Sequence, residues 1–212
     1  QCLVGSEMCI RDRRYDADWR ESTYKNYFWM VPYDLQGLID SIGGKEAAEK
    51  RLDEMFRRLD ASYGDEWFAS GNEPSFQIPW IYNWAGAPYK AQQVIRRILN
   101  EQYSSRVNGL PGNDDLGSMG AWYVFASIGL FPEIPGVGGF SVNSPVFRKI
   151  VLHLPEGDVI IKGGDEKKEY IHSLSLDGKK MEGTWIDWSD LYRGATLEYK
   201  LSCLLYTSPS PR

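Results

Sequence analysis

Cysteine and histidine are scarce in this chain, and their scarcity excludes several kinds of site. Its 3 cysteines stand close to the two ends, at Cys2, Cys9 and Cys203. A disulfide framework or a thiol site in the body of the chain is therefore excluded. Its 2 histidines are His153 and His172. A zinc site or histidine-based catalysis is not expected from so few imidazoles.

The chain also lacks an excess of positive charge and a long hydrophobic run. Its formal net charge is −5 at pH 7, whereas a nucleic-acid groove requires a basic stripe. No apolar stretch approaches the roughly 20 residues that cross a bilayer. We therefore expect neither a nucleic-acid partner nor a membrane span in this chain.

The two terminal segments resemble translated sequencing-library adapter. Residues 3–13 and 203–212 can be encoded by DNA strings that are reverse complements of each other over nearly their whole length, and the strings match the transposon end used in tagmentation. We therefore assign residues 1–13 and 203–212 to adapter and exclude them from fold reasoning. The alternative is a pair of ordinary cysteine-containing tails that form a weak intermolecular disulfide.

Aromatic residues are abundant, at 14% of the chain with 8 tryptophans. Many of them follow tight polar turns. Residues 71–75 read Gly-Asn-Glu-Pro-Ser and precede an aromatic segment, and residues 110–117 read Leu-Pro-Gly-Asn-Asp-Asp-Leu-Gly and precede another. Carboxylates supply acids, bases or ligands for hard metals, and aromatic rings supply flat faces for sugar rings. The combination indicates carbohydrate chemistry, and the alternative is a large aromatic core.

Hydrophobic periodicity divides the chain into helices followed by strands. The expected fold class is α+β, with a boundary near Phe147. The helix at 115–128 is almost wholly apolar, so we expect it to be buried. An Asp177-Gly178 turn is typical of a hairpin. The expected helices are 34–42, 45–61, 79–84, 89–102 and 115–128, and the expected strands are 150–154, 159–162, 171–176 and 196–201.

Asp114 and Asp115 stand at the start of that apolar helix and have two interpretations. One is N-capping, in which a carboxylate accepts a bond from a free backbone N–H and offsets the helix dipole. The other is catalysis, because two adjacent carboxylates and Asn113 exceed what a cap needs. Mutual repulsion would raise the pKa of one of them, as a general base requires.

Glu73, Glu21 and Asp34 are open to the same choice. Glu73 with Asn72 is either a solvated turn or a set of hard oxygen donors for calcium. Glu21 lies among aromatic residues, whose packing would raise its pKa and keep it protonated as a general acid. A surface glutamate paired with Arg20 or Lys25 is the alternative. Asp34 is either a residue of the site or only the N-cap of the helix that follows it.

These motifs together resemble glycoside hydrolase family 92, whose members are calcium-dependent, inverting exo-α-mannosidases. The order and spacing match over most of residues 19–147, and the strand region matches more loosely. The resemblance rests on Glu21, residues 27–38 (Tyr-Phe-Trp-Met-Val-Pro-Tyr-Asp-Leu-Gln-Gly-Leu), Gly43-Gly44, residues 71–75, Tyr82-Asn83, Ala85-Gly86, Pro88, residues 109–117 and residues 121–125.

The resemblance implies a fold, a location and a cofactor. The family joins an N-terminal β-sandwich to an (α/α)6 barrel, so residues 14–147 would be the last part of that barrel. Residues 148–202 would be antiparallel strands of a sandwich-like region. The N-terminal sandwich of the same parent chain would be a partner, calcium the cofactor, mannose-containing glycans such as N-glycans the substrate, and the location secreted or periplasmic.

The resemblance also implies roles for individual residues. Asp115 with Asp114 would be the base that activates water, and Glu21 would be the general acid, although the family usually has Glu-Gly-Asn where this chain has Glu-Ser-Thr. Inversion needs acid and base about 6.5–9.5 Å apart, which separate loops allow. Asn72 and Glu73 would lie at the calcium and the terminal mannose, and Trp29, Tyr33, Asp34 and Trp84 near the sugar.

Two alternatives to an α-mannosidase remain. One is a related helical-barrel glycosidase with another specificity. Phe76 and Gln77 stand where the family often has histidine, which implies a different linkage preference. The other is a carbohydrate-binding or structural fragment without turnover. The enzyme hypothesis requires Glu21, Glu73 and Asp115 to converge on one cavity, whereas binding requires only an aromatic platform.

Overall fold

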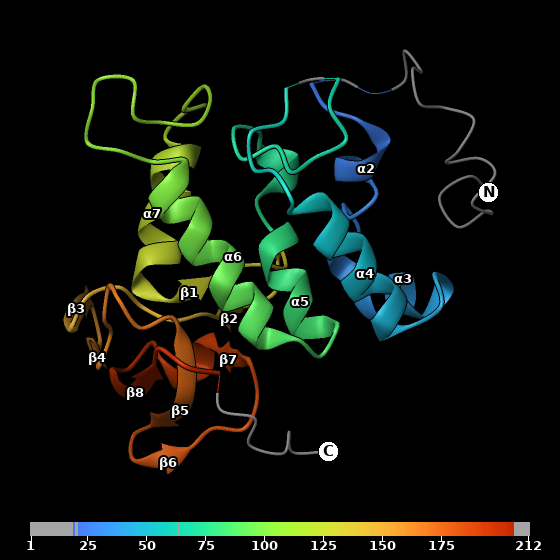
Figure 1. Ribbon diagram of the computed structural model, residues 1–212. Helices are drawn as coiled ribbons and strands as arrows, with labels where there is room; N and C mark the ends of the chain where they lie inside the picture. Colours follow the sequence, from blue (N-terminus) through green and yellow to red (C-terminus); the bar gives the residue numbers. More distant parts are fainter. Residues whose placement is uncertain (1–18, 20, 63, 206–212) are drawn as a thin grey trace.

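The computed structural model describes residue 19 and residues 21–62 and 64–205. Helices form one part of the molecule and strands the other (Figure 1). The expected α+β class is therefore confirmed. Most of the two terminal segments assigned to adapter lies outside the described residues. The helices are α2 (Tyr24–Tyr27), α3 (Leu35–Ser41), α4 (Lys45–Met55), α5 (Ile81–Trp84), α6 (Pro88–Glu101) and α7 (Ser118–Ile128), with 3-10 turns η1 (Pro32–Asp34), η2 (Glu73–Ser75), η3 (Ile78–Trp80) and η4 (Trp188–Asp190).

Two helices differ in length from the expectation. Helix α4 ends at Met55 rather than near residue 61, because the carbonyl of Met55 accepts from Phe68 N and that of Phe56 from Arg97 Nη1. Helix α7 begins at Ser118 rather than at residue 115. Asp115 and Leu116 have φ angles of 44° and 60°, and this left-handed backbone cannot continue a right-handed helix.

The strands form two sheets. β1 (Leu130–Phe131), β2 (Gly139–Val142) and β7 (Trp185–Asp187) make a three-stranded sheet in the order β1-β2-β7. The five-stranded sheet has the order β3-β4-β8-β5-β6. Strand structure thus begins at Leu130, well before residue 147, since β1 and β2 are too short to show periodicity. The larger sheet contains β3 (Lys149–Leu154), β4 (Gly157–Lys162), β5 (Tyr170–Leu176), β6 (Lys179–Lys180) and β8 (Ala195–Ser202).

The larger sheet departs from the expected antiparallel arrangement at one pairing. Strands β4 and β8 run parallel, with Val159 opposite Ala195, because the β5–β6 hairpin and the β7 strand intervene between them in the chain. The hairpin itself is as expected, with Leu176 opposite Lys179 across the Asp177-Gly178 turn.

The helices and the strands have separate hydrophobic clusters that meet at Phe125 on α7. The expectation that α7 is buried on all sides is wrong in part. Its inward face carries Met119, Trp122 and Ala126, but the side chain of Val124 is 56% exposed and Tyr123 is also exposed. The apolar sequence of a helix does not show which of its faces has a packing partner.

Helix α6 joins the helical part to the strands through two polar side chains. Arg96 is 5% exposed, and its guanidinium donates to the carbonyls of Ser144, Pro145 and Lys168 at 3.4 Å each. Gln92, one turn earlier, accepts from Ile171 N at 2.9 Å. Burial lowers the pKa of the Arg96 guanidinium. The strands are thus held against α6 by hydrogen bonds as well as by apolar contact.

Glu133 occupies a second buried polar position, after β1. It is 2% exposed and accepts from Trp84 Nε1 at 3.3 Å and from the Ser141 hydroxyl. Its Oε1 has no hydrogen-bond partner. Desolvation raises the pKa of Glu133 to about 7, although the two donors act in the opposite direction. A carboxyl group therefore lies inside the contact between α5 and the three-stranded sheet.

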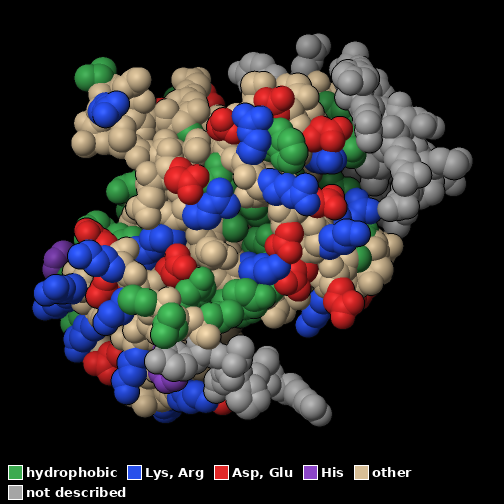
Figure 2. Space-filling model, viewed as in Figure 1, with side chains coloured by type: hydrophobic (Ala, Val, Ile, Leu, Met, Phe, Trp, Pro, Cys, Tyr) green, Lys and Arg blue, Asp and Glu red, His purple; other side chains and the backbone are tan. Residues whose placement is uncertain are grey.

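The surface is mixed in charge. On the face shown in Figure 2, acidic and basic side chains are interspersed over both the helices and the strands. None of the helices in the described part of the chain is long and apolar enough to cross a membrane.

Candidate active site

The two polar motifs lie on loops at the end of the helices that faces away from the strands (Figure 1). One loop runs from α4 to η2 and contains residues 71 and 72, and the other runs from α6 to α7 and contains residues 110–117. The segment before α2, which carries Glu21, approaches the same place. Motifs far apart in sequence are therefore brought together at one rim.

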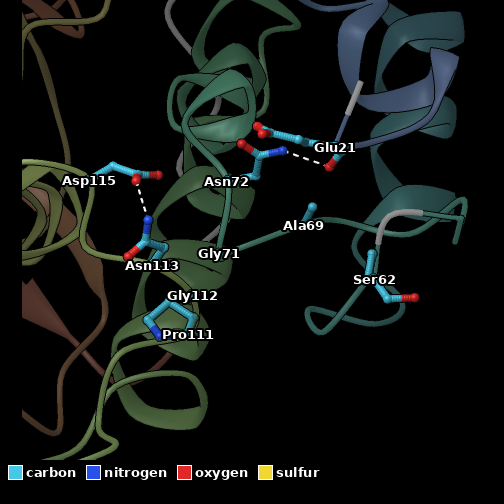
Figure 3. A pocket seen from close by; sticks show the side chains of 10 residues that line it. Glu21, Ser62, Ala69, Gly71, Asn72, Pro111, Gly112, Asn113 and Asp115 are labelled. Carbon is cyan, nitrogen blue, oxygen red and sulfur yellow. Dashed lines mark hydrogen bonds between the residues drawn. The ribbon is translucent and has the colours of Figure 1, made fainter. Parts of the chain in front are cut away.

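These three segments enclose a cavity of about 310 Å³. Glu21 and Asp115 both line it, from different loops, as does Asn72 (Figure 3). The volume suits a small ligand. Two of the predicted catalytic carboxylates thus face one space. The remaining lining residues are Ala61, Ser62, Ala69, Gly71, Pro111, Gly112 and Asn113.

Backbone contact between Gly71 and Gly112 holds the two loops together. A Cβ atom added to Gly71 would lie 2.6 Å from the carbonyl oxygen of Pro111, and one added to Gly112 would lie 2.3 Å from that of Gly71. Real side chains do not come so close to backbone atoms, so only glycine permits this approach. The contact brings the Asn72-Glu73 turn beside the Asn113-Asp114-Asp115 turn.

The two adjacent aspartates do different things. Asp114 Oδ1 accepts from Gly120 N at 3.1 Å and the Asp114 carbonyl accepts from Ser118 N at 2.8 Å. Asp114 therefore satisfies N–H groups in the first turn of α7, although Gly117 holds the N-cap position itself. Asp115 is exposed at the cavity and accepts a short bond from the Asn113 amide. The side chain that faces the cavity is therefore that of Asp115.

Glu73 lies beside Asp115. A hydrogen bond shared with Glu73, partial desolvation and the charges of Glu73 and Asp114 raise the pKa of Asp115. The hydroxyl of Ser118, in the first turn of α7, donates to Glu73 Oε1 at 3.3 Å. Glu21 and Asp115 thus line the cavity, whereas Glu73 is not among its lining residues and contacts Asp115 instead.

The backbone at the cavity is strained. Four non-glycine residues in the described ranges have positive φ: Glu21 at 61°, Asp115, Leu116 and Asp177. Asp177 is the hairpin turn, whereas the other three lie at or next to the cavity. Such conformations persist only where the surroundings hold them, and they concentrate at functional sites.

Glu21 is not packed among aromatic rings as expected. Its side chain is exposed, and the nearby rings of Trp19 and Tyr27 stack on each other with centroids 5.2 Å apart. Desolvation and the negative charge of Glu21 raise the pKa of Tyr27. The predicted burial of Glu21 among rings is therefore not found, because Trp19 and Tyr27 pack against each other instead.

The four residues predicted to lie near the sugar are placed elsewhere in the described part of the chain. Trp29 is 2% exposed and packs within the helical core. Asp34 caps α3 by accepting from Gly37 N at 3.0 Å. Trp84 donates to Glu133, and Tyr33 is exposed. None of the four lines the cavity.

Oxygen donors suited to a hard cation gather at the cavity. Glu73 and Asp115 supply carboxylates, and Asn72 and Asn113 supply amide oxygens. The described ranges contain no group of three or more His, Cys, Asp or Glu residues that could hold a metal ion. The donor set fits calcium in chemical type, since Ca²⁺ binds 6–8 oxygens that include water and amide or backbone oxygens.

Several residues of this site were not singled out from the sequence. Ser62 lines the cavity, and its hydroxyl donates to Asp65 at 2.8 Å; the Ser-Tyr-Gly-Asp turn was its only local signal. Ser118, the first residue of α7, had no local signal for its bond to Glu73. The Gly71 contact with Gly112 had no sequence signal, because it joins residues 41 positions apart.

Residues 7–203 match the model of the glycosyl hydrolase family 92 catalytic domain. The chain belongs to this family of glycosidases, and the resemblance stated from the motifs is confirmed.

Solved structures of the family share the fold of this chain. The GH92 α-mannosidase BT3965 of Bacteroides thetaiotaomicron superimposes with a TM-score of 0.82 at 33% identity, over 90% of this chain and 26% of that protein. The GH92 inverting mannosidase BT2199 of the same species superimposes with a TM-score of 0.79 at 27% identity, over 90% of this chain and 29% of that protein. A structure of BT3965 in complex with mannoimidazole is also similar, with a TM-score of 0.80.

A curated relative is the uncharacterized secreted glycosidase of Arthroderma benhamiae. It is 31% identical over 191 residues, which are 85% of this chain and 24% of the relative. The chain thus spans about a quarter of the length of the relatives that it matches.

Proposed function

We propose that the parent protein of this chain hydrolyses terminal α-linked mannose, with α-1,2 linkages as the preferred substrate. One observation carries the proposal: Glu21 and Asp115 line one cavity from different loops. Family membership and the similarity to two solved mannosidases support it. Mannose-containing glycans, N-glycans among them, are the proposed substrates.

The proposed reaction inverts the anomeric configuration. The bond between the anomeric carbon and the leaving oxygen breaks, and that oxygen keeps the electron pair and takes a proton from Glu21. A water oxygen forms the new bond to the anomeric carbon while Asp115 accepts its proton. Glu73 and Asp114 favour the proton-accepting role by raising the pKa of Asp115. Proton exchange with solvent then restores both carboxyl groups.

Calcium is the proposed cofactor, held by Glu73 and Asn72. When bound, it would hold sugar hydroxyls and offset negative charge next to Asp115. The contact of Gly71 with Gly112 supports this assignment, since it joins the turn that carries these oxygens to the loop of Asp115. We also propose that the parent carries an N-terminal β-sandwich and is secreted or periplasmic, a location for which the secreted relative of Arthroderma benhamiae is the support.

The test uses the completed parent protein, purified and shown to be folded. Mannose release from α-1,2-mannobiose is measured with calcium and with chelator, and Asp115→Ala is compared with the unmodified protein. We expect calcium-dependent release that Asp115→Ala lowers at least about a hundredfold. The exposed Asn100→Asp on α6 is the matched control and should keep full activity.

Two results would contradict this proposal. Equal mannose release with chelator and with calcium would show that the enzyme does not need calcium as a cofactor. No release from any α-mannoside by the folded protein would leave a carbohydrate-binding or structural role as the better account.

A further inference from the structure

One hydrogen bond joins the two most distant parts of the site. Asn72 Nδ2 donates to the backbone carbonyl of Glu21 at 2.7 Å, across 51 residues of sequence. Figure 3 shows this bond at the wall of the cavity. We propose that Asn72 is a positioning residue that fixes the backbone of Glu21 and so aims its carboxyl group at the leaving oxygen. This inference rests on the proposed function, in which Glu21 is the general acid.

Glu21 needs such a restraint. Its φ angle of 61° lies in the left-handed region, which a residue with a Cβ atom leaves unless neighbouring groups hold it. Its side chain is exposed, so packing does not orient it. A hydrogen bond to the Glu21 carbonyl restrains the peptide unit that follows the residue and limits the directions available to the side chain.

Asn72 is rigid enough to act as that restraint. Its side chain is 6% exposed. Its backbone N–H donates to Ala69 O at 3.3 Å, and its carbonyl accepts from Ser75 N at 3.1 Å. The donor is thus fixed in a turn that is bonded on both sides.

Asn26 ties the same turn to the segment that carries Glu21. Asn26 lies on α2, is fully buried, and its Oδ1 accepts from the hydroxyl of Ser75 at 3.0 Å and from Ala69 N at 3.3 Å. Its Nδ2 donates to Trp67 O at 2.9 Å. The two asparagines thus make a double link between the Glu21 segment and the turn at 67–75, and only the Asn72 link contacts Glu21 itself.

The bond uses the amide nitrogen of Asn72 and leaves its oxygen available. The same side chain can therefore position Glu21 and also supply an oxygen donor at the cavity. A carboxylate at this position would have no N–H to donate and would repel the Glu21 carbonyl. Asn72→Asp thus removes the positioning bond and keeps an oxygen.

The test separates acid catalysis from binding by the leaving group. In the completed parent protein, kcat/KM is measured for α-1,2-mannobiose, whose leaving group needs a proton, and for 2,4-dinitrophenyl α-mannoside, whose leaving group does not. Glu21→Gln serves as the reference for a lost acid. Asn100→Asp, the same chemical change at an exposed position of α6, is the control.

We expect Asn72→Asp and Glu21→Gln to lower kcat/KM at least about a hundredfold for mannobiose and less than about tenfold for the dinitrophenyl substrate. If Asn72 served only in sugar or metal binding, Asn72→Asp would lower kcat/KM for both substrates by the same factor. That result would overturn the positioning role. If Asn72→Asp does not fold by circular dichroism, Asn72→Ala, which lacks the repelling carboxylate, is judged by the same ratio.

The reference variant keeps the two levels of the proposal apart. A leaving-group effect in Glu21→Gln that is absent from Asn72→Asp overturns only the positioning role. Equal losses on both substrates in Glu21→Gln overturn the assignment of Glu21 as the acid, and the positioning role fails with it.

Discussion

Glu133 shows how a single carboxyl group can set the pH dependence of stability. It is buried between α5 and the three-stranded sheet, and desolvation raises its pKa from 4.5 to about 7. The unfolded chain therefore releases this proton near pH 4.5, and the folded chain keeps it until about pH 7. Stability from this group is complete below pH 4.5 and is lost as the pH rises towards 7.

We expect Glu133→Gln to remove this loss. At pH 8 the variant should be more stable than the unmodified chain by on the order of 3 kcal/mol, whereas at pH 4.5 the two should agree within about 1 kcal/mol. Urea unfolding at both pH values measures this. An equal difference in unfolding free energy at both pH values would mean that Glu133 does not titrate between them.

Gly112 tests whether the contact between the two site loops matters for activity. A methyl group there would meet the carbonyl oxygen of Gly71 at 2.3 Å and its Cα at 2.7 Å, and these backbone atoms cannot move without separating the loops. We expect Gly112→Ala to lower mannose release by the completed parent at least about tenfold, since small displacements of catalytic groups are costly. Gly64→Ala, with nothing within 4 Å of the added Cβ, should be neutral, and an equal loss in both variants would contradict this reason.

At the scale of elements, helix α6 is the connection between the helices and the strands. Arg96 is buried and satisfies carbonyl groups of Ser144, Pro145 and Lys168, which lie between and beside the strands. Removing its guanidinium would take one donor from each of these carbonyls, although Pro145 O still accepts from Asp165 N and Ser144 O from Asn143 Nδ2. The loss of several hydrogen bonds around a buried side chain is costly.

We expect Arg96→Ala to lower the free energy of unfolding by roughly 2–4 kcal/mol. Arg193→Ala is the matched control, because Arg193 is exposed and its contact with Glu156 is 3.7 Å long; it should cost less than about 1 kcal/mol. The urea midpoints of the two variants provide the comparison. If both changed the midpoint alike, the docking of strands on α6 would not depend on Arg96.

At the scale of the whole molecule, the chain spans about a quarter of the length of its relatives. It also exposes apolar side chains on and beside α7. Val124 and Tyr123 on α7 and Leu116 in the loop before it are exposed, and exposed apolar clusters promote association. We expect the 212-residue chain alone to release no mannose and to associate as its concentration rises. Light scattering and a mannose assay on the purified chain measure both. Mannose release by the monomeric chain would show that this quarter is a sufficient catalyst.

Local chemistry allowed much of this protein to be predicted from its sequence. Helical spacing located α3, α6 and most of α4, and the Asp177-Gly178 turn fixed the register of its hairpin. Gly/Pro turns with carboxylates located both site loops. These features depend on neighbours within a few residues, which the sequence displays directly.

The tertiary structure decided what depends on partners far along the chain. It buried Trp29 in the core, bonded Asp114 to the first turn of α7 and left Asp115 at the cavity, and paired β4 with β8 in parallel. It also bonded Asn72 to Glu21 and brought Gly71 against Gly112. Residue type states what a side chain can do, whereas the packing of distant segments decides which of those capacities is used.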